Sequence, residues 1–267
     1  MALLWLYLPI GIVTGFLAGL LGIGGGAILV PAFLLAAEAE GFPARHAMHM
    51  ALGTSLACIL VSSLVSMRAH HRHQAVHLAM VRGMAPAILT GSLAGTFLAA
   101  ALPAAPLKWL FLLFLLFVAQ GLWRPVQPQP HVRAPGAWLL AAVGALIGGF
   151  SSLVGIGGAS LTVSFLLWCS IGMHEAIGTS AALGFPIALA GTLGYAINGW
   201  SVPGLPAGSL GYVYLPAFAG VTLSSFFAVP LGARTAHRLP VQTLRRTFAL
   251  VLGAIALRML AAQLGWF

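Results

Sequence analysis

The chain has 267 residues, of which 60% are hydrophobic and only 6% are charged. Soluble domains carry about a quarter charged residues, so this composition excludes a soluble globular protein and indicates a polytopic membrane protein. The net charge of +9 comes from 12 basic and 3 acidic residues. Because the basic residues lie in short segments between apolar runs, they indicate membrane orientation rather than nucleic-acid binding.

Ten apolar segments are expected to form helices, since runs of about twenty apolar residues match the thickness of a bilayer. They cover residues 3–22, 25–38, 46–67, 76–102, 106–123, 136–153, 157–172, 174–198, 208–233 and 243–264. Whether segments 25–38 and 157–172 cross the bilayer completely stays open at this point. The proline-rich stretch 124–137 cannot continue a helix, and we expect a cytoplasmic linker there, between a first transmembrane repeat (1–123) and a second (138–267).

The two halves share sequence blocks in the same order. An offset of 133 aligns Gly15–Pro31 with Gly148–Ser164, and seven of the seventeen positions are identical. An offset of 125 aligns His49–Ser55 (HMALGTS) with His174–Ser180 (HEAIGTS), with five of seven positions identical. The difference of 133 − 125 = 8 residues predicts an insertion in the first half, around AEAEGFPARHA. We interpret the chain as a duplicated five-segment unit.

The basic residues predict which side of the membrane each loop occupies. Alternating the side after every segment puts nine basic residues on one side and three on the other. The side richer in Lys and Arg is cytoplasmic, so both termini are expected outside. Five segments are an odd number, so the second unit enters the membrane from the opposite face. The predicted fold is an all-α membrane protein of two inverted repeats, a plan typical of secondary transporters.

Glycine-rich motifs occur at corresponding places in both halves, as GIGGG and GIGGA. A dinucleotide fingerprint needs a preceding strand and an acidic residue about twenty positions further on, and this chain has neither. Close helix packing through small residues is one interpretation. The other is a broken helix whose freed N–H groups line a polar cavity and bind an anion. The recurrence favours the second, with a substrate path along Gly22, Gly24, Gly25, Gly26, Gly155, Gly157 and Gly158.

A second repeated motif, GTS, lies inside two of the predicted helices. Such hydroxyl groups most often bond to their own helix backbone. Two equivalent copies favour a shared role instead, because inverted symmetry brings them together and hydroxyl donors bind an oxyanion reversibly. The candidate residues are Gly53, Thr54 and Ser55 in the first half and Gly178, Thr179 and Ser180 in the second.

The remaining ionisable residues are candidates for proton coupling, for the mouth of a cavity and for a solvated loop. Glu175 beside His174 is either a charge at a helix N-terminus or a proton-carrying pair. Arg82 is a candidate for the mouth of a cavity, because it is expected deeper than the other loop arginines. The tract AHHRHQAVH is interpreted as a solvated cytoplasmic loop rather than a metal site, and no cofactor or enzymatic constellation is expected.

These motifs, with Pro31 after the first glycine cluster, resemble the TauE/SafE sulfite exporter family, also called the toluene sulfonate uptake permease family. The resemblance covers about residues 8–262. It implies a bacterial inner-membrane permease for sulfur-containing anions, often an exporter, with the glycine and GTS motifs lining the path. The second copy departs from the pattern, since Ala159 replaces the third glycine and Ser164 stands opposite Pro31.

The predicted function is therefore alternating-access transport of a small sulfur-containing oxyanion, most plausibly sulfite or an organosulfonate, by export. Proton coupling and homo-oligomers are compatible with the sequence. An anion channel and an uptake permease for another small anion are the alternatives, because both can use the same lining. The sequence leaves the anion, the direction, the coupling ion and the oligomeric state open.

Overall fold

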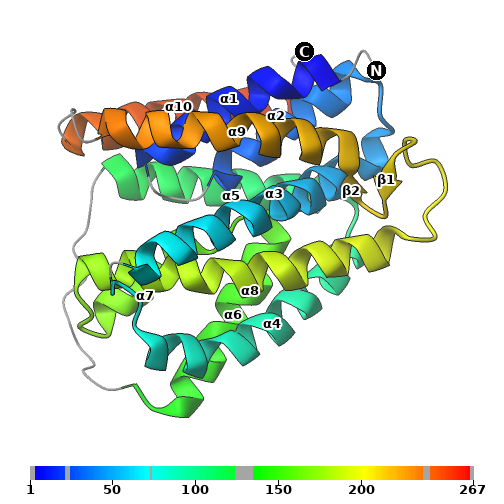
Figure 1. Ribbon diagram of the computed structural model, residues 1–267. Helices are drawn as coiled ribbons and strands as arrows, with labels where there is room; N and C mark the ends of the chain where they lie inside the picture. The colour runs from blue at the N-terminus through cyan, green and yellow to red at the C-terminus, as the bar shows by residue number, and fades with distance from the viewer. Residues whose placement is uncertain (1–3, 22–24, 73, 124–134, 237–240, 265–267) are drawn as a thin grey trace.

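The computed structural model describes residues 4–21, 25–72, 74–123, 135–236 and 241–264. This part of the chain forms ten α-helices and one β-hairpin (Figure 1). The elements are α1 (Leu4–Leu21), α2 (Gly26–Ala39), α3 (Ala44–Arg72), α4 (Leu78–Ala101), α5 (Ala104–Trp123), α6 (Ala137–Val154), α7 (Ala159–Trp168), α8 (Met173–Gly199), β1 (Ser209–Leu210), β2 (Val213–Tyr214), α9 (Leu215–Ala236) and α10 (Val241–Gln263).

Seven of the described helices are long and apolar enough to cross a membrane: α3, α4, α5, α6, α8, α9 and α10. By contrast, α2 has 14 residues and α7 has 10. At about 1.5 Å per residue, neither reaches across a hydrocarbon core of about 30 Å. The chain is thus a polytopic helical membrane protein, and the two short segments left open above are too short to cross alone.

Two predicted boundaries are wrong. The histidine tract was expected to be a loop, but α3 continues through His70 and His71 to Arg72. No glycine or proline interrupts that stretch, and the turn comes at Gln74, which has a positive φ of 55°. Segment 208–233 was expected to be helical throughout, but a β-hairpin precedes α9. The proline-rich linker at 124–137 lies largely outside the described residues.

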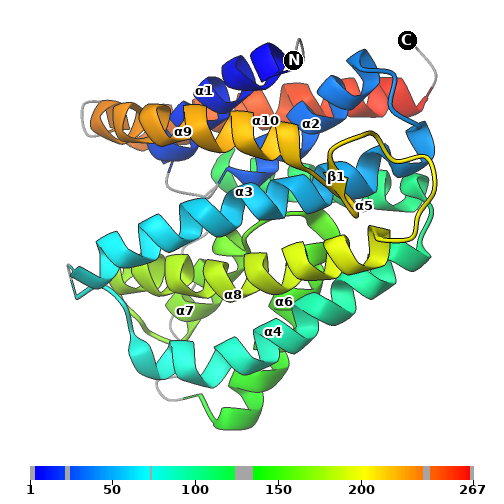
Figure 2. The same ribbon diagram turned by 45° about the vertical axis from the view of Figure 1, so that its right-hand side comes forward.

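Helices α3 and α8 cross the centre of the molecule and are the most buried of the long helices. Around them, α1 packs on α9, α4 packs on α6, and α5 packs on α10. Figures 1 and 2 show α1 and α9 side by side in one layer and α4 and α6 in the opposite layer. We call the end where α3 finishes and α4 begins the His77 end, and the end with the β-hairpin the Tyr214 end. Helix α1 begins at the Tyr214 end, whereas α6 begins at the His77 end (Figure 1).

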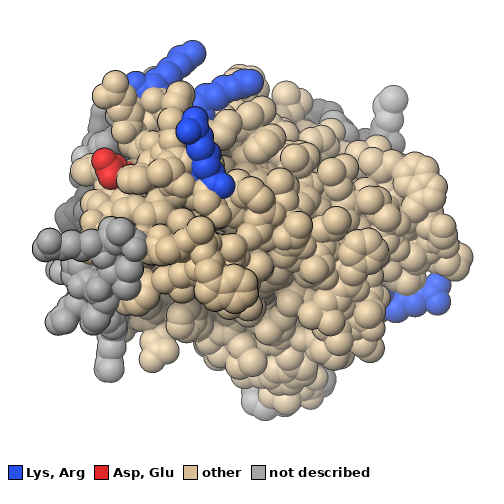
Figure 3. Space-filling view, turned by 90° about the horizontal axis from the view of Figure 1, so that it is seen from below, with Lys and Arg blue, Asp and Glu red and all other residues tan. Residues whose placement is uncertain are grey.

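The surface separates charged from uncharged regions along the helix direction. Figure 3 shows a broad face without charge in its middle, and the Lys and Arg side chains stand towards its edges. Exposed Leu, Phe and Trp side chains cover the long helices, for example Phe117, Leu146 and Phe227. A chain with this surface is solvated by lipid around its middle and by water at its ends.

Glycines let α1 and α9 approach closely. A Cβ atom added to Gly11 would stand 2.7 Å from the Cα atom of Val221, and one added to Gly15 would stand 2.7 Å from that of Ser225. Small residues at this i, i+4 spacing are typical of tightly packed membrane helices. Backbone therefore packs on backbone along this contact.

The contact between α6 and α4 uses corresponding positions. A Cβ atom on Gly144 would lie 3.0 Å from the carbonyl oxygen of Met84, and one on Gly148 would collide with that of Ile88. Adding the repeat offset of 133 to the residue numbers of Gly11 and Gly15 gives Gly144 and Gly148, so these glycines occupy equivalent positions in the two units. The residues that they contact are equivalent as well, because adding 137 to the numbers of Met84 and Ile88 gives Val221 and Ser225. Close packing through small residues is thus present at Gly15 and Gly148, which lie before the GIGGG and GIGGA motifs.

We predict that Gly148→Ala lowers the melting temperature of the detergent-solubilised protein, because the new methyl group meets the backbone of α4. Overpacking of this kind costs about 1–3 kcal/mol. The matched control is Gly121→Ala on α5, where an added Cβ has nothing within 4 Å. Equal melting temperatures for the two variants would contradict the packing described here.

Candidate functional site

The two glycine motifs meet in the interior. A Cβ atom on Gly26, at the start of α2, would lie 2.9 Å from the carbonyl oxygen of Gly155 and 3.0 Å from the Cα atom of Ile156. We call each pair of successive helices a hairpin, α1 with α2 and α6 with α7, and the described start of α2 contacts the turn 155–158 at the tip of the second hairpin. Gly22 and Gly24 lie outside the described residues, so the first tip is described from Gly25 onwards.

The second motif interrupts the helix completely. Helix α6 ends at Val154 and α7 begins at Ala159. Gly155 and Gly158 have φ angles of 69° and 68°, a left-handed conformation that glycine adopts without steric cost. Within this turn, the N–H of Ile156 still donates to the carbonyl of Ser151 at 3.0 Å.

The sequence difference between the two motifs has a structural reason. Ala159 already lies within α7, at a position that needs no left-handed backbone. Its counterpart Gly26 also begins a helix, but it faces the backbone of Gly155 directly and has no room for a side chain. The third glycine is therefore required only in the first copy, where the two hairpin tips meet.

The threonines of the GTS motifs bind main chain from the opposite half. The Tyr214 N–H donates to Thr54 Oγ1 at 3.0 Å, and the His77 N–H donates to Thr179 Oγ1 at 2.8 Å. Both threonine side chains are buried. Hydroxyls within helices usually bond to their own helix backbone. Here the Thr54 hydroxyl accepts the N–H of the residue directly before α9, and the Thr179 hydroxyl accepts the N–H of the residue directly before α4.

The glycines of the same motifs leave room for the backbone just before α9 and α4. A Cβ atom on Gly53 would lie 2.9 Å from the carbonyl oxygen of Tyr212, and one on Gly178 would collide with that of Ala75. The offset of 137 that relates His77 to Tyr214 also relates Ala75 to Tyr212. In each GTS motif, glycine and threonine thus fasten the segment that leads into the other half's packing helix.

The serines of the GTS motifs are directed to the second helix break. Ser55 Oγ donates to the carbonyl of Gly155 at 3.0 Å, and Ser180 Oγ donates to that of Ala159 at 3.3 Å. Both serines are fully buried. One serine from each half therefore donates to a carbonyl at this break, and Ser55 satisfies the Gly155 carbonyl of the turn itself, as buried backbone requires.

Two further hydroxyls lie at this break without a hydrogen-bond partner: Ser151 Oγ and Thr162 Oγ1. Ser151 Oγ stands 2.9 Å from the place of a Cβ on Gly158, the residue that caps α7. Gly158 offers no side-chain cap, so the first N–H groups of α7 have no side-chain acceptor there. Neither residue was predicted from the sequence, although Ser151 lies only four residues before Gly155 of the second glycine motif.

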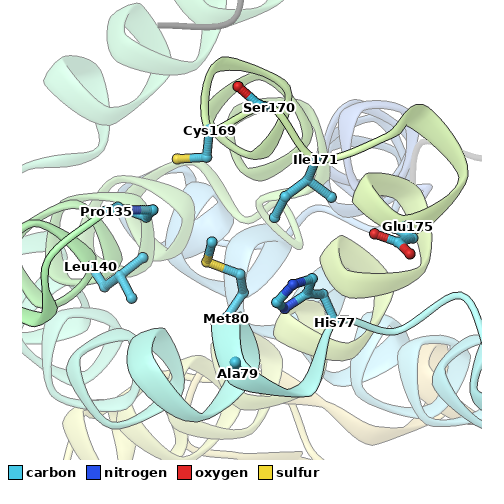
Figure 4. Close-up of a pocket in the computed structure, with 9 residues that line it drawn as sticks. All are labelled: His77, Ala79, Met80, Pro135, Leu140, Cys169, Ser170, Ile171 and Glu175. Atoms are coloured by element: carbon cyan, nitrogen blue, oxygen red, sulfur yellow. The ribbon is translucent and has the colours of Figure 1, made fainter. Parts of the chain in front are cut away.

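A cavity of about 400 Å³ opens at the His77 end (Figure 4). Its lining includes His77, Met80, Leu140, Cys169 and Glu175. Glu175 lies in the first turn of α8 and is exposed.

The other predicted residues of this end lie at the surface. His174 and Arg82 are exposed, and neither is among the residues that line this cavity. Arg82 is not deeper than Arg68 and Arg72, which are exposed as well. Helix α4 already includes Arg82 in its second turn, with its side chain turned outwards.

We predict that Thr54→Val lowers the melting temperature, because the buried N–H of Tyr214 loses its acceptor. Leaving such a group unpaired costs about 1–3 kcal/mol. Thr54→Ser retains the hydroxyl and is expected to restore most of the loss. If valine is tolerated as well as serine, the hydrogen bond does not hold the segment before α9.

Comparison with known proteins agrees with this architecture. Residues 7–259 match the family model described as sulfite exporter TauE/SafE. A "Probable membrane transporter protein" of Haemophilus influenzae is 37% identical over 257 residues, which cover 95% of this chain and 97% of that protein. A similarly described protein of Methanocaldococcus jannaschii is 24% identical, with 96% of each chain covered. No solved structure matches. The chain belongs to the TauE/SafE sulfite exporter family and is a membrane transporter.

Proposed function

We propose that the protein is a secondary transporter for a small sulfur-containing oxyanion, most plausibly sulfite or an organosulfonate, and that it works by alternating access. The observation that carries the proposal is the contact between the two hairpin tips, Gly26 against Gly155. Non-helical backbone at membrane depth is tolerated where it lines a polar site or is buried in protein. In secondary transporters, such breaks form the substrate site.

The proposed inverted repeat rests on reciprocal packing. Helix α1 of the first unit packs on α9 of the second, and α6 of the second packs on α4 of the first. A simple translation of one unit would produce only one of these contacts, whereas a two-fold rotation produces both. The equivalent glycine contacts and the bonds at Thr54 and Thr179 support the same rotation. Because α1 and α6 begin at opposite ends (Figure 1), the rotation axis lies in the membrane plane.

The proposed anion site is the N-terminus of α7 together with the hydroxyls around it. Helix N-termini present N–H groups and a positive dipole end, which suit an oxyanion. Ser151 and Thr162 add two buried hydroxyls that have no partner within the protein. The residues that form this break are uncharged, so an anion is held without a fixed cation and can leave again.

The two threonine contacts are proposed as alternating latches. Thr54 holds the segment before α9 at the Tyr214 end, and Thr179 holds the segment before α4 at the His77 end. Release of one latch at a time opens the hairpin tips to one side only. In this way the GTS motifs belong to the substrate path by controlling access to it.

The proposal includes orientation and coupling. The His77 end is cytoplasmic in a bacterial inner membrane, with both termini outside, because exposed arginines such as Arg68 and Arg72 lie there. Export then starts from the cavity at that end. Glu175, with His174 beside it, is the proposed proton-exchanging group at its mouth, and Arg82 contributes positive potential there.

We predict that Thr162→Val raises the KM for sulfite in proteoliposomes about fivefold to tenfold, equivalent to loss of one hydrogen bond of about 1–1.5 kcal/mol. Its melting temperature should not fall, since the hydroxyl has no protein partner.

The matched control lies on the same helix. Ser164 is exposed and donates to its own backbone at Ser160, 2.9 Å away, so Ser164→Ala should leave the KM unchanged. Equal KM values for both variants would place the anion elsewhere. Flux that never saturates would favour an anion channel.

A further inference from the structure

Glu40 has an unusual environment for a carboxylate. Both of its side-chain oxygens are shut off from solvent, and neither completes a hydrogen bond. The titratable groups that face it are the hydroxyls of Tyr7 on α1 and Tyr214 on β2. The two tyrosine rings lie 6.0 Å apart, and Phe42 meets Tyr214 edge-on at 5.1 Å. The carboxylate is thus enclosed by aromatic rings at the Tyr214 end.

Its position on the backbone also disfavours a negative charge. Glu40 is the C-cap residue of α2, where its own N–H donates to the carbonyl of Ala36. The C-terminus of a helix carries the negative end of the helix dipole. Burial raises the pKa of Glu40 above its usual range, and the neighbouring Tyr7 hydroxyl offsets only part of this change. Both effects favour the protonated form while the rings stay closed around it.

The repeat relates this cluster to the open cavity at the other end. The turn after α2 has Gly41 at φ 70°, and the turn after α7 has Ser170 at φ 64°. The numbers of Gly41 and Ser170 differ by 129. The hydrogen bonds of the two turns are related by the same offset, since the Phe42 N–H donates to the Ala37 carbonyl and the Ile171 N–H donates to the Leu166 carbonyl. Glu40 then corresponds to Cys169, just as Tyr7 corresponds to Leu140 (offset 133) and Tyr214 to His77 (offset 137).

All three counterparts line the cavity at the His77 end. The same positions therefore line a cavity at one end of the molecule and pack together at the other. Resting on the alternating-access mechanism proposed above, this difference describes one state of a cycle: a cavity reaches in from the His77 end while the Thr179 latch is still fastened, and the Tyr214 end is closed. In the opposite state, the rings around Glu40 separate and water reaches the carboxylate.

We propose that Glu40 is a proton-binding residue of the gate at the Tyr214 end, protonated when this end closes and ionised when it opens. Closing then requires a proton from that side, because an ionised carboxylate would be buried beside the neutral hydroxyls of Tyr7 and Tyr214, with no positive charge in the described part of the chain to balance it. Tyr214 connects the gate to the latch, since its N–H is held by Thr54. Acidity on the Tyr214 side favours the closed end.

Glu40 lies between two insertions in the first unit. The offset falls from 133 at the glycine motifs to 129 at the turn and 125 at the GTS motifs. Each step of four residues is about one helical turn, so α2 is one turn longer than α7, and α3 begins one turn further ahead of its GTS motif than α8 does. A carboxylate at this position occurs in the first unit alone, since its counterpart is Cys169, and this makes the two gates chemically different.

The test uses the full-length protein and the variant Glu40→Gln, which mimics the protonated residue, with Glu38→Gln as matched control. Glu38 lies two residues away on α2 and is exposed. Infrared spectra recorded over a pH titration should show the carbonyl band of a protonated carboxylic acid near neutral pH. This band is expected in the parent protein and in Glu38→Gln, and it should be missing in Glu40→Gln.

The second measurement is flux of a labelled sulfonate into proteoliposomes, because a sulfonate stays ionised while the pH is changed. Acidifying the Tyr214 side by one unit should slow entry from that side by up to about tenfold, as expected for one bound proton. Glu38→Gln should respond like the parent, whereas Glu40→Gln should be slow and insensitive to pH.

Two results would overturn the gate proposal while leaving the transport proposal intact: no such infrared band in the parent, or a normal pH response in Glu40→Gln. If the parent carries neither sulfonate nor sulfite, the transport proposal fails. The infrared titration still decides whether Glu40 binds the proton.

Discussion

Every backbone N–H and carbonyl inside a membrane needs a partner within the protein, and this requirement governs the centre of the molecule. Helix α6 breaks at Gly155–Gly158, where Ser55 donates to the carbonyl of Gly155 and Ser180 donates to that of Ala159, the first residue of α7. The tip of the other hairpin packs directly against this break at Gly26. Near the start of α7, the hydroxyls of Ser151 and Thr162 have no hydrogen-bond partner among the described residues, and they belong to the proposed anion site.

Much of the fold could be predicted from the sequence, because lipid imposes long apolar runs. The ten segments correspond to the ten described helices within a few residues, apart from the ends of α3 and the hairpin before α9. The errors have local causes. The histidine tract contains no helix breaker, and the backbone bonds of a two-residue strand leave little trace in an apolar sequence.

The site was only partly predictable. Repetition drew attention to the glycine and GTS motifs, but it could not separate the role of each residue within them. Gly53 and Thr54 fasten a distant segment, whereas the adjacent Ser55 is directed to the helix break. Such division of roles depends on which face of α3 each residue occupies relative to the other half. Ser151, Thr162 and Glu40 were missed because their significance lies in partners that are absent or enclosed, which sequence spacing does not reveal.

The central claim is alternating access to one anion site. The most direct measurement is counterflow in proteoliposomes, in which unlabelled sulfite is loaded inside and the entry of labelled sulfite is followed. The account predicts saturable entry that is accelerated by internal sulfite and inhibited by organosulfonates. Entry that neither saturates nor responds to internal sulfite would contradict it and indicate a pore.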